Sequence, residues 1–291
     1  MSNKRSRTLA ERIRENFDEL TRAEHQLADI ILENYPVSAM GSITILANAS
    51  RVSTPTVARM ARKLGFSGFP AMQIALREEL EATISNPIAK HERFAEGAPD
   101  THILNRFADA ALENMRQSLK RIDPDAFDKV AALLSNSESD VYVAGGRITH
   151  TIAQYFFTHM QVIRKGMNLI DAGSSTWPHF VLNMNEGDVL VAFDIRRYER
   201  DLLRLAEMAT ARGATLVLFT DQWGSPAARH ARHVFNLRIE VPSAWDSSVV
   251  TLFLVEALLA AVQTNTWGET RDRVEALEEL FDKTKLFRKF S

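Results

Sequence analysis

The stretch 42–69, SITILANASRVSTPTVARMARKLGFSGF, decides how the first part of this chain folds. Its apolar residues recur at helical spacing in two short runs: Ile43, Leu46 and Ala47, then Val57, Ala61 and Leu64. Between them, Ala49-Ser50-Arg51 suits a tight corner. Ser53 stands where the second run needs an N-cap, and Pro55 lies in its first turn, where a missing N–H removes no helical hydrogen bond. The pattern predicts a helix-turn-helix.

The polar face of the second helix carries side chains that suit DNA. Short hydroxyls can approach base edges, and longer cations can reach phosphates or guanine. No Asp or Glu occurs between Glu33 and Glu78, so a polyanion would meet no repulsion there. We predict that double-stranded operator DNA contacts Ser42, Arg51, Ser53, Thr54, Thr56, Arg59, Arg62, Lys63 and Ser67. The alternative is a helical hairpin with an ordinary solvated basic face.

The composition of the whole chain is that of a globular protein with two domains. It has 291 residues, of which 45% are hydrophobic and 25% charged, and a net charge of -2. The absence of Cys excludes disulfides, thiol catalysis and thiolate metal sites. The N-terminus lacks the apolar run of a signal peptide, and the most apolar stretch, 249–262, falls short of the ~20 residues that span a bilayer. We expect a cytoplasmic protein with no membrane partner.

Periodicity divides the chain into a helical part and a mixed part. Residues 1–84 form the predicted all-α helix-turn-helix domain, with further helices over 8–16, 21–34 and 69–83. Turn residues at 85–87 and 96–99 indicate a linker over 85–100. Residues 101–291 form the second domain, which begins with helices over 101–121 and 124–134.

Short apolar runs alternate with helical segments in the second domain. Strands are predicted over 141–144, 167–170, 188–193, 215–220 and 234–237, with helices over 152–163, 201–212 and 247–262 and an amphipathic helix beyond 267. This alternation predicts an α/β domain with a doubly wound parallel sheet. Ligands of such sheets bind beyond the carboxyl ends of the strands, which here places them near 145–149, 194–198 and 221–225.

Two sets of residues resemble a known family. Thr21-x-x-Glu24, Leu46-Ala47, Val52-Ser53, Thr56-Val57-x-Arg59 and the run KLGFSGF at 63–69 resemble the N-terminal domain of the RpiR/MurR family of bacterial transcriptional regulators. The second half resembles the sugar isomerase (SIS) domain of that family at 141–145, Gly187-Asp188, Gly213-Ala214, Thr220-Asp221 and Ser225-Pro226. The resemblance implies a repressor or activator whose SIS domain senses a metabolite, usually a phosphosugar, and mediates oligomerisation. A homodimer or dimer of dimers would also let two helix-turn-helix units engage two half-sites.

Two ligand loops depart from the family pattern. Where the resemblance implies Gly-x-Gly-x-Ser, this chain has GGRIT at 145–149, and where it implies the hydroxyl cluster Ser-x-Ser-Gly-x-Thr, this chain has DIRRYE at 194–199. We therefore predict a small anionic effector, phosphosugar or carboxylate, that is bound by guanidinium groups. The predicted effector-binding residues are Gly145, Gly146, Arg147, Thr149, Asp194, Arg196 and Arg197. The alternative is an internal salt-bridge network that closes the pocket.

Ligand-responsive regulation is the function that these features favour over catalysis. The alternative is an aldose–ketose isomerase with an appended helical domain, which needs a base poised near neutral pH beside a carbon-bound proton. Glu256 and His150 are the candidates for that base. We predict no catalytic residues and no cofactor. We also predict no metal, because His230 and His233 have i,i+3 spacing without a placed carboxylate.

Overall fold

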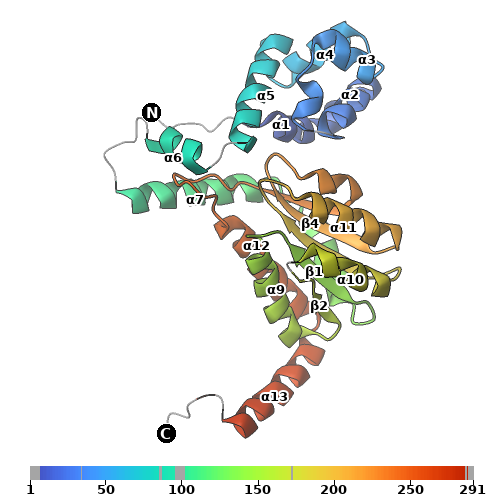
Figure 1. Ribbon diagram of the computed structural model, residues 1–291, viewed down its shortest axis with the longest axis vertical. Helices are drawn as coiled ribbons and strands as arrows, with labels where there is room; N and C mark the ends of the chain where they lie inside the picture. The colour runs from blue at the N-terminus through green and yellow to red at the C-terminus, as the bar shows by residue number, and fades with distance from the viewer. Residues whose placement is uncertain are drawn as a thin grey trace.

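The N-terminal helices and the α/β domain lie end to end in the computed structural model, and the last helix leaves from the far end (Figure 1). The structure describes residues 7–33, 35–84, 87–95, 102–171, 173–285 and 287. The described residues confirm the predicted fold class, a helical domain followed by a doubly wound parallel sheet.

The N-terminal domain is built from short helices around one apolar core. They are α1 (Leu9–Glu15), α2 (Arg22–Glu33), α3 (Ile43–Ala49), α4 (Thr54–Lys63) and α5 (Phe69–Ile84), with 3-10 turns η1 (Phe17–Glu19) and η2 (Val37–Ala39). Leu27, Leu46, Met60 and Leu76 are fully buried and join four of these helices. Burial of such side chains stabilises a domain by about 1.5–3 kcal/mol each.

The helix-turn-helix forms where the sequence predicts it. Arg51 turns the corner after α3 in a left-handed conformation, with φ 53°. Ser53 caps α4, because its Oγ accepts a hydrogen bond from the Thr56 amide at 3.4 Å. Gly65 ends α4 at φ 84°, and a Cβ there would also lie 2.9 Å from Arg12 Nη1 of α1. Both ends of α4 are thus fixed.

Three helices lead from the first domain to the sheet: α6 (Pro87–Ala95), α7 (Ile103–Leu119) and α8 (Pro124–Ser135). Helix α6 falls inside the predicted linker 85–100, of which residues 85–86 and 96–100 lie outside the described residues. Its Lys90 is buried, with Nζ 2.6 Å from Asp246 Oδ1 of the α/β domain. This part of the linker is therefore packed against the second domain.

The sheet has the strand order β2-β1-β3-β4-β5, and all its pairs are parallel. The strands are β1 (Val141–Gly145), β2 (Met167–Leu169), β3 (Val189–Asp194), β4 (Thr215–Asp221) and β5 (His233–Leu237), as predicted to within one or two residues. The order reverses between β1 and β3, and this switch point is where doubly wound sheets bind ligands. It brings the loops that follow Gly145 and Asp194 together.

Helices cover both faces of the sheet. On one face, α8, α9 (His150–Ile163) and α12 (Val249–Asn265) bury Val143, Val191 and Val217. On the other face, α10 (Trp177–Asn183), α11 (Arg200–Ala211) and the 3-10 turn η4 (Pro226–His230) bury Ala144, Leu190 and Leu218. A further 3-10 turn, η3 (Ser174–Thr176), precedes α10.

The last two helices meet at a sharp bend. Helix α13 (Trp267–Thr284) runs at 100° to α12 and points away from the sheet (Figure 1). Within the described ranges, no single helix is both long and apolar enough to cross a membrane; only the bent pair α12 and α13 reaches the required length and composition.

Candidate DNA-binding surface and effector site

The outward face of α4 presents cations to solvent. Arg59 and Arg62 are exposed, and among the described residues neither pairs with a carboxylate. Arg59 Nη2 donates to Thr56 Oγ1 at 3.3 Å, which holds the guanidinium over the first turn of the helix. Guanidinium groups in this position can contact guanine or phosphate when the helix enters a major groove.

Two of the predicted DNA contacts are placed differently. Thr56 is buried rather than exposed, and its hydroxyl is already engaged by Ser53 Oγ at 2.9 Å and by Arg59 Nη2 at 3.3 Å. Lys63 Nζ pairs with Glu24 Oε2 of α2 at 2.8 Å, and this contact opposes burial and lowers the pKa of Glu24. The stretch between Glu33 and Glu78 contains no carboxylate of its own, but folding brings Glu24 of α2 against it.

The other predicted DNA contacts lie around α4. Ser42 is exposed and caps α3, with its Oγ accepting from the Ile45 amide at 3.3 Å. Arg51, Ser53 and Ser67 are exposed, and Thr54 is half-buried at the start of α4. The surface therefore combines small hydroxyl groups with arginines, as the sequence indicates.

The loop between β1 and α9 is closed by its own hydrogen bonds. Thr149 Oγ1 accepts from the Gly146 amide at 2.8 Å and donates to Phe193 O at 2.7 Å. Gly145 is packed tightly, because a Cβ there would lie 2.5 Å from Thr149 O. The hydroxyl predicted to bind effector instead ties this loop to β3.

In the loop between β1 and α9, a carboxylate of the protein already accepts a hydrogen bond from a backbone amide. Glu199 Oε1 accepts from the Arg147 amide at 2.8 Å, and a Cβ on Gly146 would lie 2.5 Å from the same oxygen. The Arg147 side chain is exposed. The loop can thus hold an anion, and Glu199 supplies one from within the protein.

Buried carboxylates hold the loop between β3 and α11. Asp194 is buried and accepts a hydrogen bond from Ser225 Oγ, while burial raises its pKa to about 7. Asp221 is fully buried at the end of β4 and accepts from the Arg196 amide and from Tyr198 Oη, both at 2.7 Å. Burial raises the pKa of Asp221 as well.

The two arginines of this loop have different environments. Arg196 Nε and Nη2 donate to Asp246 Oδ2 and Oδ1 at 2.8 and 3.0 Å, and its guanidinium stacks 4.2 Å from the centre of the Trp223 ring. A second carboxylate, Glu240, lies 3.6 Å away. Arg197 is exposed at φ 51°. Arg196 therefore forms the internal salt-bridge network considered as the alternative, whereas Arg197 faces solvent.

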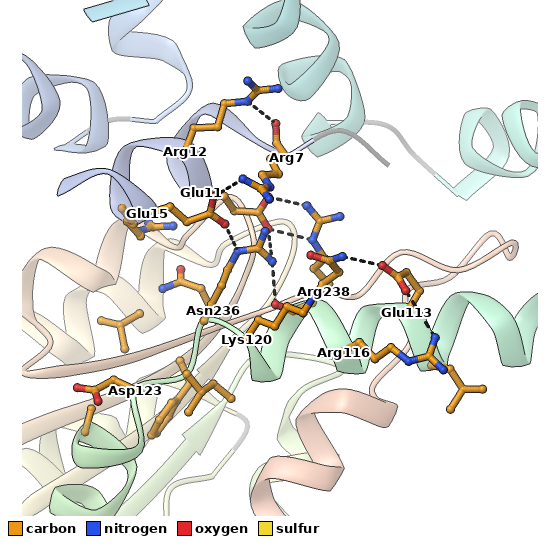
Figure 2. Close-up of a pocket in the computed structure, with 18 of the residues that line it drawn as sticks. Arg7, Glu11, Arg12, Glu15, Glu113, Arg116, Lys120, Asp123, Asn236 and Arg238 are labelled. Atoms are coloured by element: carbon orange, nitrogen blue, oxygen red, sulfur yellow. Dashed lines mark hydrogen bonds and ion pairs between the residues drawn. The ribbon is translucent and has the colours of Figure 1, made fainter. Parts of the chain in front are cut away.

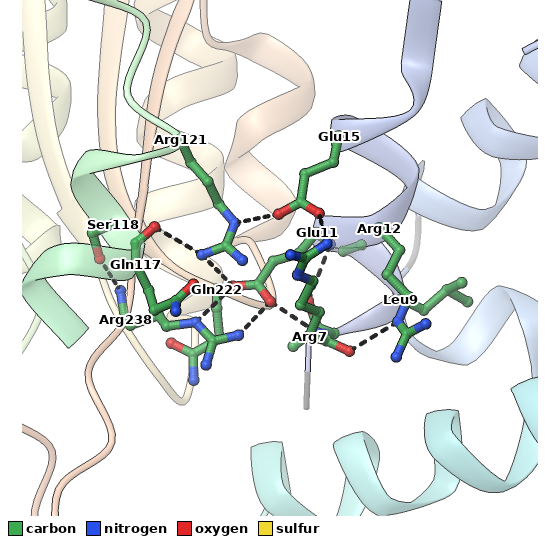
Figure 3. A network of polar contacts seen from close by, with 12 residues as sticks. Arg7, Leu9, Glu11, Arg12, Glu15, Gln117, Ser118, Arg121, Gln222 and Arg238 are labelled. Atoms are coloured by element: carbon green, nitrogen blue, oxygen red, sulfur yellow. Dashed lines mark hydrogen bonds and ion pairs between the residues drawn. The ribbon is translucent and has the colours of Figure 1, made fainter. Parts of the chain in front are cut away.

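The carboxyl edge of the sheet also carries the first domain. Arg238, which follows β5, donates through Nε and Nη2 to Glu11 of α1 at 3.0 and 2.5 Å. Arg121 Nε donates to Glu15 Oε1 at 2.9 Å (Figure 3). Helix α1 thus rests on the edge of the sheet where ligand loops are expected.

The residues considered for catalysis or metal binding lie on different elements of the α/β domain. Glu256 is exposed on α12 and accepts from Tyr155 Oη at 2.9 Å, while His150 begins α9. His230 Nε2 lies 3.5 Å from Glu207 Oε1, and His233 lies on β5. In the part of the chain that the structure describes, no three His, Asp or Glu side chains form a cluster that could hold a metal ion.

Sequence reasoning missed Asp246 and the acidic residues of α1. Asp246 lies in the loop after β5, far along the chain from Arg196, and no periodicity links the two. The signal that was present is the parallel-sheet prediction, which brings all carboxyl-end loops to one edge.

A helix-turn-helix joined to a parallel sheet with ligand loops at its switch point defines the class of this protein. Residues 7–83 match the helix-turn-helix domain of the rpiR family, and residues 133–261 match the SIS domain. The chain belongs to the RpiR family of transcriptional regulators.

Relatives and solved structures agree with this assignment. The chain is 25% identical over 287 residues to the HTH-type transcriptional regulator HexR of Pseudomonas aeruginosa, covering 94% of this chain and 95% of that protein. It shares a TM-score of 0.55 and 21% identity with the sugar isomerase domain of the RpiR transcription factor from Sphaerobacter thermophilus, over 60% of this chain and 97% of that chain. The structure of the Vibrio vulnificus NanR protein complexed with ManNAc-6P has a TM-score of 0.55 and 20% sequence identity to this chain, and the match covers 97% of this chain and 100% of that chain. These two structures share the fold.

Proposed function

We propose that this regulator binds an operator in double-stranded DNA through α4, and that a small anionic metabolite at the carboxyl edge of its SIS domain changes the operator affinity. The observation that carries the proposal is the position of α1 against the carboxyl edge of the sheet. Its Glu11 and Glu15 contact Arg238 and Arg121, so the DNA-binding domain rests on the edge that holds the ligand loops. A ligand at that edge can therefore bias the position of α4 by its different affinity for two domain arrangements.

The proposed effector contacts are the amides and cations of the two loops at the switch point. Arg147 and Arg197 are exposed and able to meet an incoming carboxylate or phosphate in bidentate fashion. Gly145, Gly146, Thr149 and Asp194 shape the loops, and Arg196 contributes only if it leaves Asp246. Glu199 occupies the Arg147 amide, so the effector has to displace it.

A thermal-shift panel of phosphosugars, amino acids and dicarboxylates tests this proposal. A ligand at ~100 times its dissociation constant adds about 2.7 kcal/mol to the free energy of unfolding. We expect Arg147→Ala and Arg197→Ala to abolish the shift, and Glu199→Gln to enlarge it because the competing charge is gone. Arg204→Ala is the control, since Arg204 is exposed on α11 and pairs only with Asp201 among the described residues.

The panel includes ManNAc-6P because the NanR structure contains it. A bound ligand must also change operator affinity in a gel-shift with DNA from upstream of the gene. The proposal is contradicted if ligands bind and neither arginine variant weakens them. Turnover of sugar phosphates by the purified protein would instead favour the isomerase.

We also propose that the regulator is a homodimer or a dimer of dimers. Two DNA-binding domains gain affinity by engaging two half-sites together. Helix α7 supplies surface for association, because its Ile103, Leu104, Leu112 and Leu119 are exposed. Light scattering at micromolar concentration is expected to give at least twice the chain mass. A monomer with unchanged operator affinity would contradict the proposal.

A further inference from the structure

A cavity lies between α1 of the DNA-binding domain, α7 with the turn that follows it, and β5. It measures about 1590 Å³, and cations outnumber acids along its walls. Figure 2 shows Glu11 and Glu15 of α1, and Arg238 and Asn236 of the α/β domain, on its walls. Its lining residues lie outside the loops 145–149 and 194–199 that supply the effector contacts proposed above, and it adjoins the third carboxyl-end loop at Gly224.

Arg14 of α1 is the most unusual group in this cavity. Its Nη1 is buried and has no hydrogen-bond partner among the described residues. Burial lowers the pKa of the guanidinium, because the charged form loses its water. A buried guanidinium with an empty donor destabilises a protein unless an anion or an acceptor meets it.

The nearby carboxylates are already engaged. Glu11 accepts from Arg238 and from the Thr8 amide, the latter at 2.8 Å. Asp221 accepts from Tyr198 Oη and the Arg196 amide, both at 2.7 Å, and from the Trp223 amide at 3.0 Å. These acids attract Arg14 from a distance, but neither hydrogen-bonds to it.

An unpaired acceptor lies beside the unpaired donor. Asn236 Oδ1 on β5 is also buried and without a hydrogen-bond partner among the described residues. Both side chains converge on Gly224, where a Cβ would lie 3.1 Å from Arg14 Nη2 and 3.7 Å from Asn236 Oδ1. One small molecule with an anionic group and a hydroxyl group can therefore satisfy both.

We propose that the cavity between α1 and β5 is a second ligand site, which binds a small oxyanion that also carries a hydroxyl group. Arg14 Nη1 donates to the anionic group, and Asn236 Oδ1 accepts from the hydroxyl. The ligand bridges the two domains, because Arg14 belongs to the first and Asn236 to the second.

Helix α1, which carries Arg14, also contacts the end of α4, the helix proposed to bind DNA. Arg12 Nη1 donates to Leu64 O at 2.8 Å, directly after α4, and its guanidinium lies 4.5 Å from the centre of the Phe66 ring. An anion held by Arg14 thus fixes the helix that supports the end of α4. The bound oxyanion stabilises the docked arrangement of the two domains.

Calorimetric titration of the full chain with inorganic phosphate and with glycerol 3-phosphate tests the site. Arg14→Met is expected to weaken phosphate binding about 10- to 100-fold, the range for losing a hydrogen bond to a charged group. Arg116→Met, which removes an exposed charge from the rim, should weaken it less than about threefold. Asn236→Leu should lower the affinity for glycerol 3-phosphate to that for phosphate, and leave phosphate binding unchanged.

Thermal unfolding in anion-free buffer supplies a second readout. Without ligand, Arg14→Met should melt at or above the temperature of the wild type, because it removes a charged group whose Nη1 is buried with no hydrogen-bond partner among the described residues. Adding phosphate should then raise the melting temperature of the wild type and leave the variant unchanged. An unfolded Arg14→Met protein in anion-free buffer would overturn the proposal, since the guanidinium would then be satisfied by the protein itself. No measurable phosphate binding, or equal losses in the Arg14 and Arg116 variants, would overturn it too.

Discussion

The outward face of α4 and the ligand loops of the SIS domain both carry arginines, yet their arginines have opposite surroundings. On α4, Arg59 and Arg62 are exposed, and no carboxylate pairs with them among the described residues. In the loops, Arg196 is held by Asp246 and Glu240, and Glu199 fills the amide of Arg147. Around Arg59 and Arg62 the first surface keeps a single sign of charge, whereas the second is balanced.

The difference follows from what each surface meets. DNA is a polyanion of fixed charge, so unpaired cations attract it without first breaking a contact. A small anion enters a partly enclosed loop, where unpaired charges would cost free energy in its absence. Internal carboxylates such as Glu199 remove that cost and set a threshold that an effector has to overcome.

The largest expected effect is on the pH dependence of stability, through the buried Asp194 of the ligand loops. Asp194 has a pKa of about 7 in the folded protein against 3.8 ordinarily, so folding favours its protonated form. Its stabilising contribution is present below pH 4 and is lost as the pH rises to 7, by roughly 4 kcal/mol. Asp194→Asn should remove this fall, as measured by denaturant unfolding between pH 4 and 8.

The N-terminal domain holds a counterpart. Glu79 also has a pKa of about 7, because it is buried, although it accepts a hydrogen bond from Tyr35 Oη. Glu79→Gln should therefore reduce the fall with the same sign. Unchanged pH profiles in both variants would show that these two carboxyls are ionised in the folded protein.

Breaking the balanced loop should cost stability. Arg196→Ala leaves the partly buried Asp246 with Lys90 as its one counter-charge among the described residues, and we expect a loss of ~3 kcal/mol in the free energy of unfolding. Arg197→Ala is the matched control, since this exposed neighbour should change stability by less than about 0.5 kcal/mol. Urea denaturation measures both. Equal effects would mean that the two arginines do not differ as described.

Removing a cation from the outward face of α4 should weaken DNA binding and leave the free energy of unfolding unchanged. Arg59→Ala should weaken a DNA site selected from a random library by ~1 to 3 kcal/mol and relax preference at one or two base pairs. Lys63→Ala should affect all sequences alike, and less, because Glu24 already neutralises this lysine. Fluorescence anisotropy at fixed salt measures both variants, and unchanged affinity in Arg59→Ala would remove α4 from the interface.

Local patterns in the sequence were enough for the fold. The cap at Ser53, the corner at Arg51 and the strands that end at Gly145 and Asp194 all depend on neighbours within a few residues. For the effector site, the sequence predicted where the loops lie but not which side chains pair within them. The partners of Arg196 and Lys63 come from distant segments, and only the folded chain brings Asp246 and Glu24 to them.

The contact between the domains escaped prediction for a related reason. Glu11, Arg14 and Glu15 are polar residues of a short amphipathic helix, and such residues normally face water. Here they face the carboxyl edge of the sheet instead. Nothing in the period of α1 distinguishes a solvated charge from one that meets a second domain.

Glu11 performs two tasks with one carboxylate. It closes the capping box of α1 by accepting from the Thr8 amide at 2.8 Å, and it pairs with Arg238 at 2.5 Å. Loss of the second domain would remove the Arg238 partner that holds Glu11 and α1 against the sheet, and would expose this side of α1 to water. The two domains are thereby linked in folding: the full chain should melt in one cooperative transition, and the first domain made alone should melt at a lower temperature than it does in the full chain.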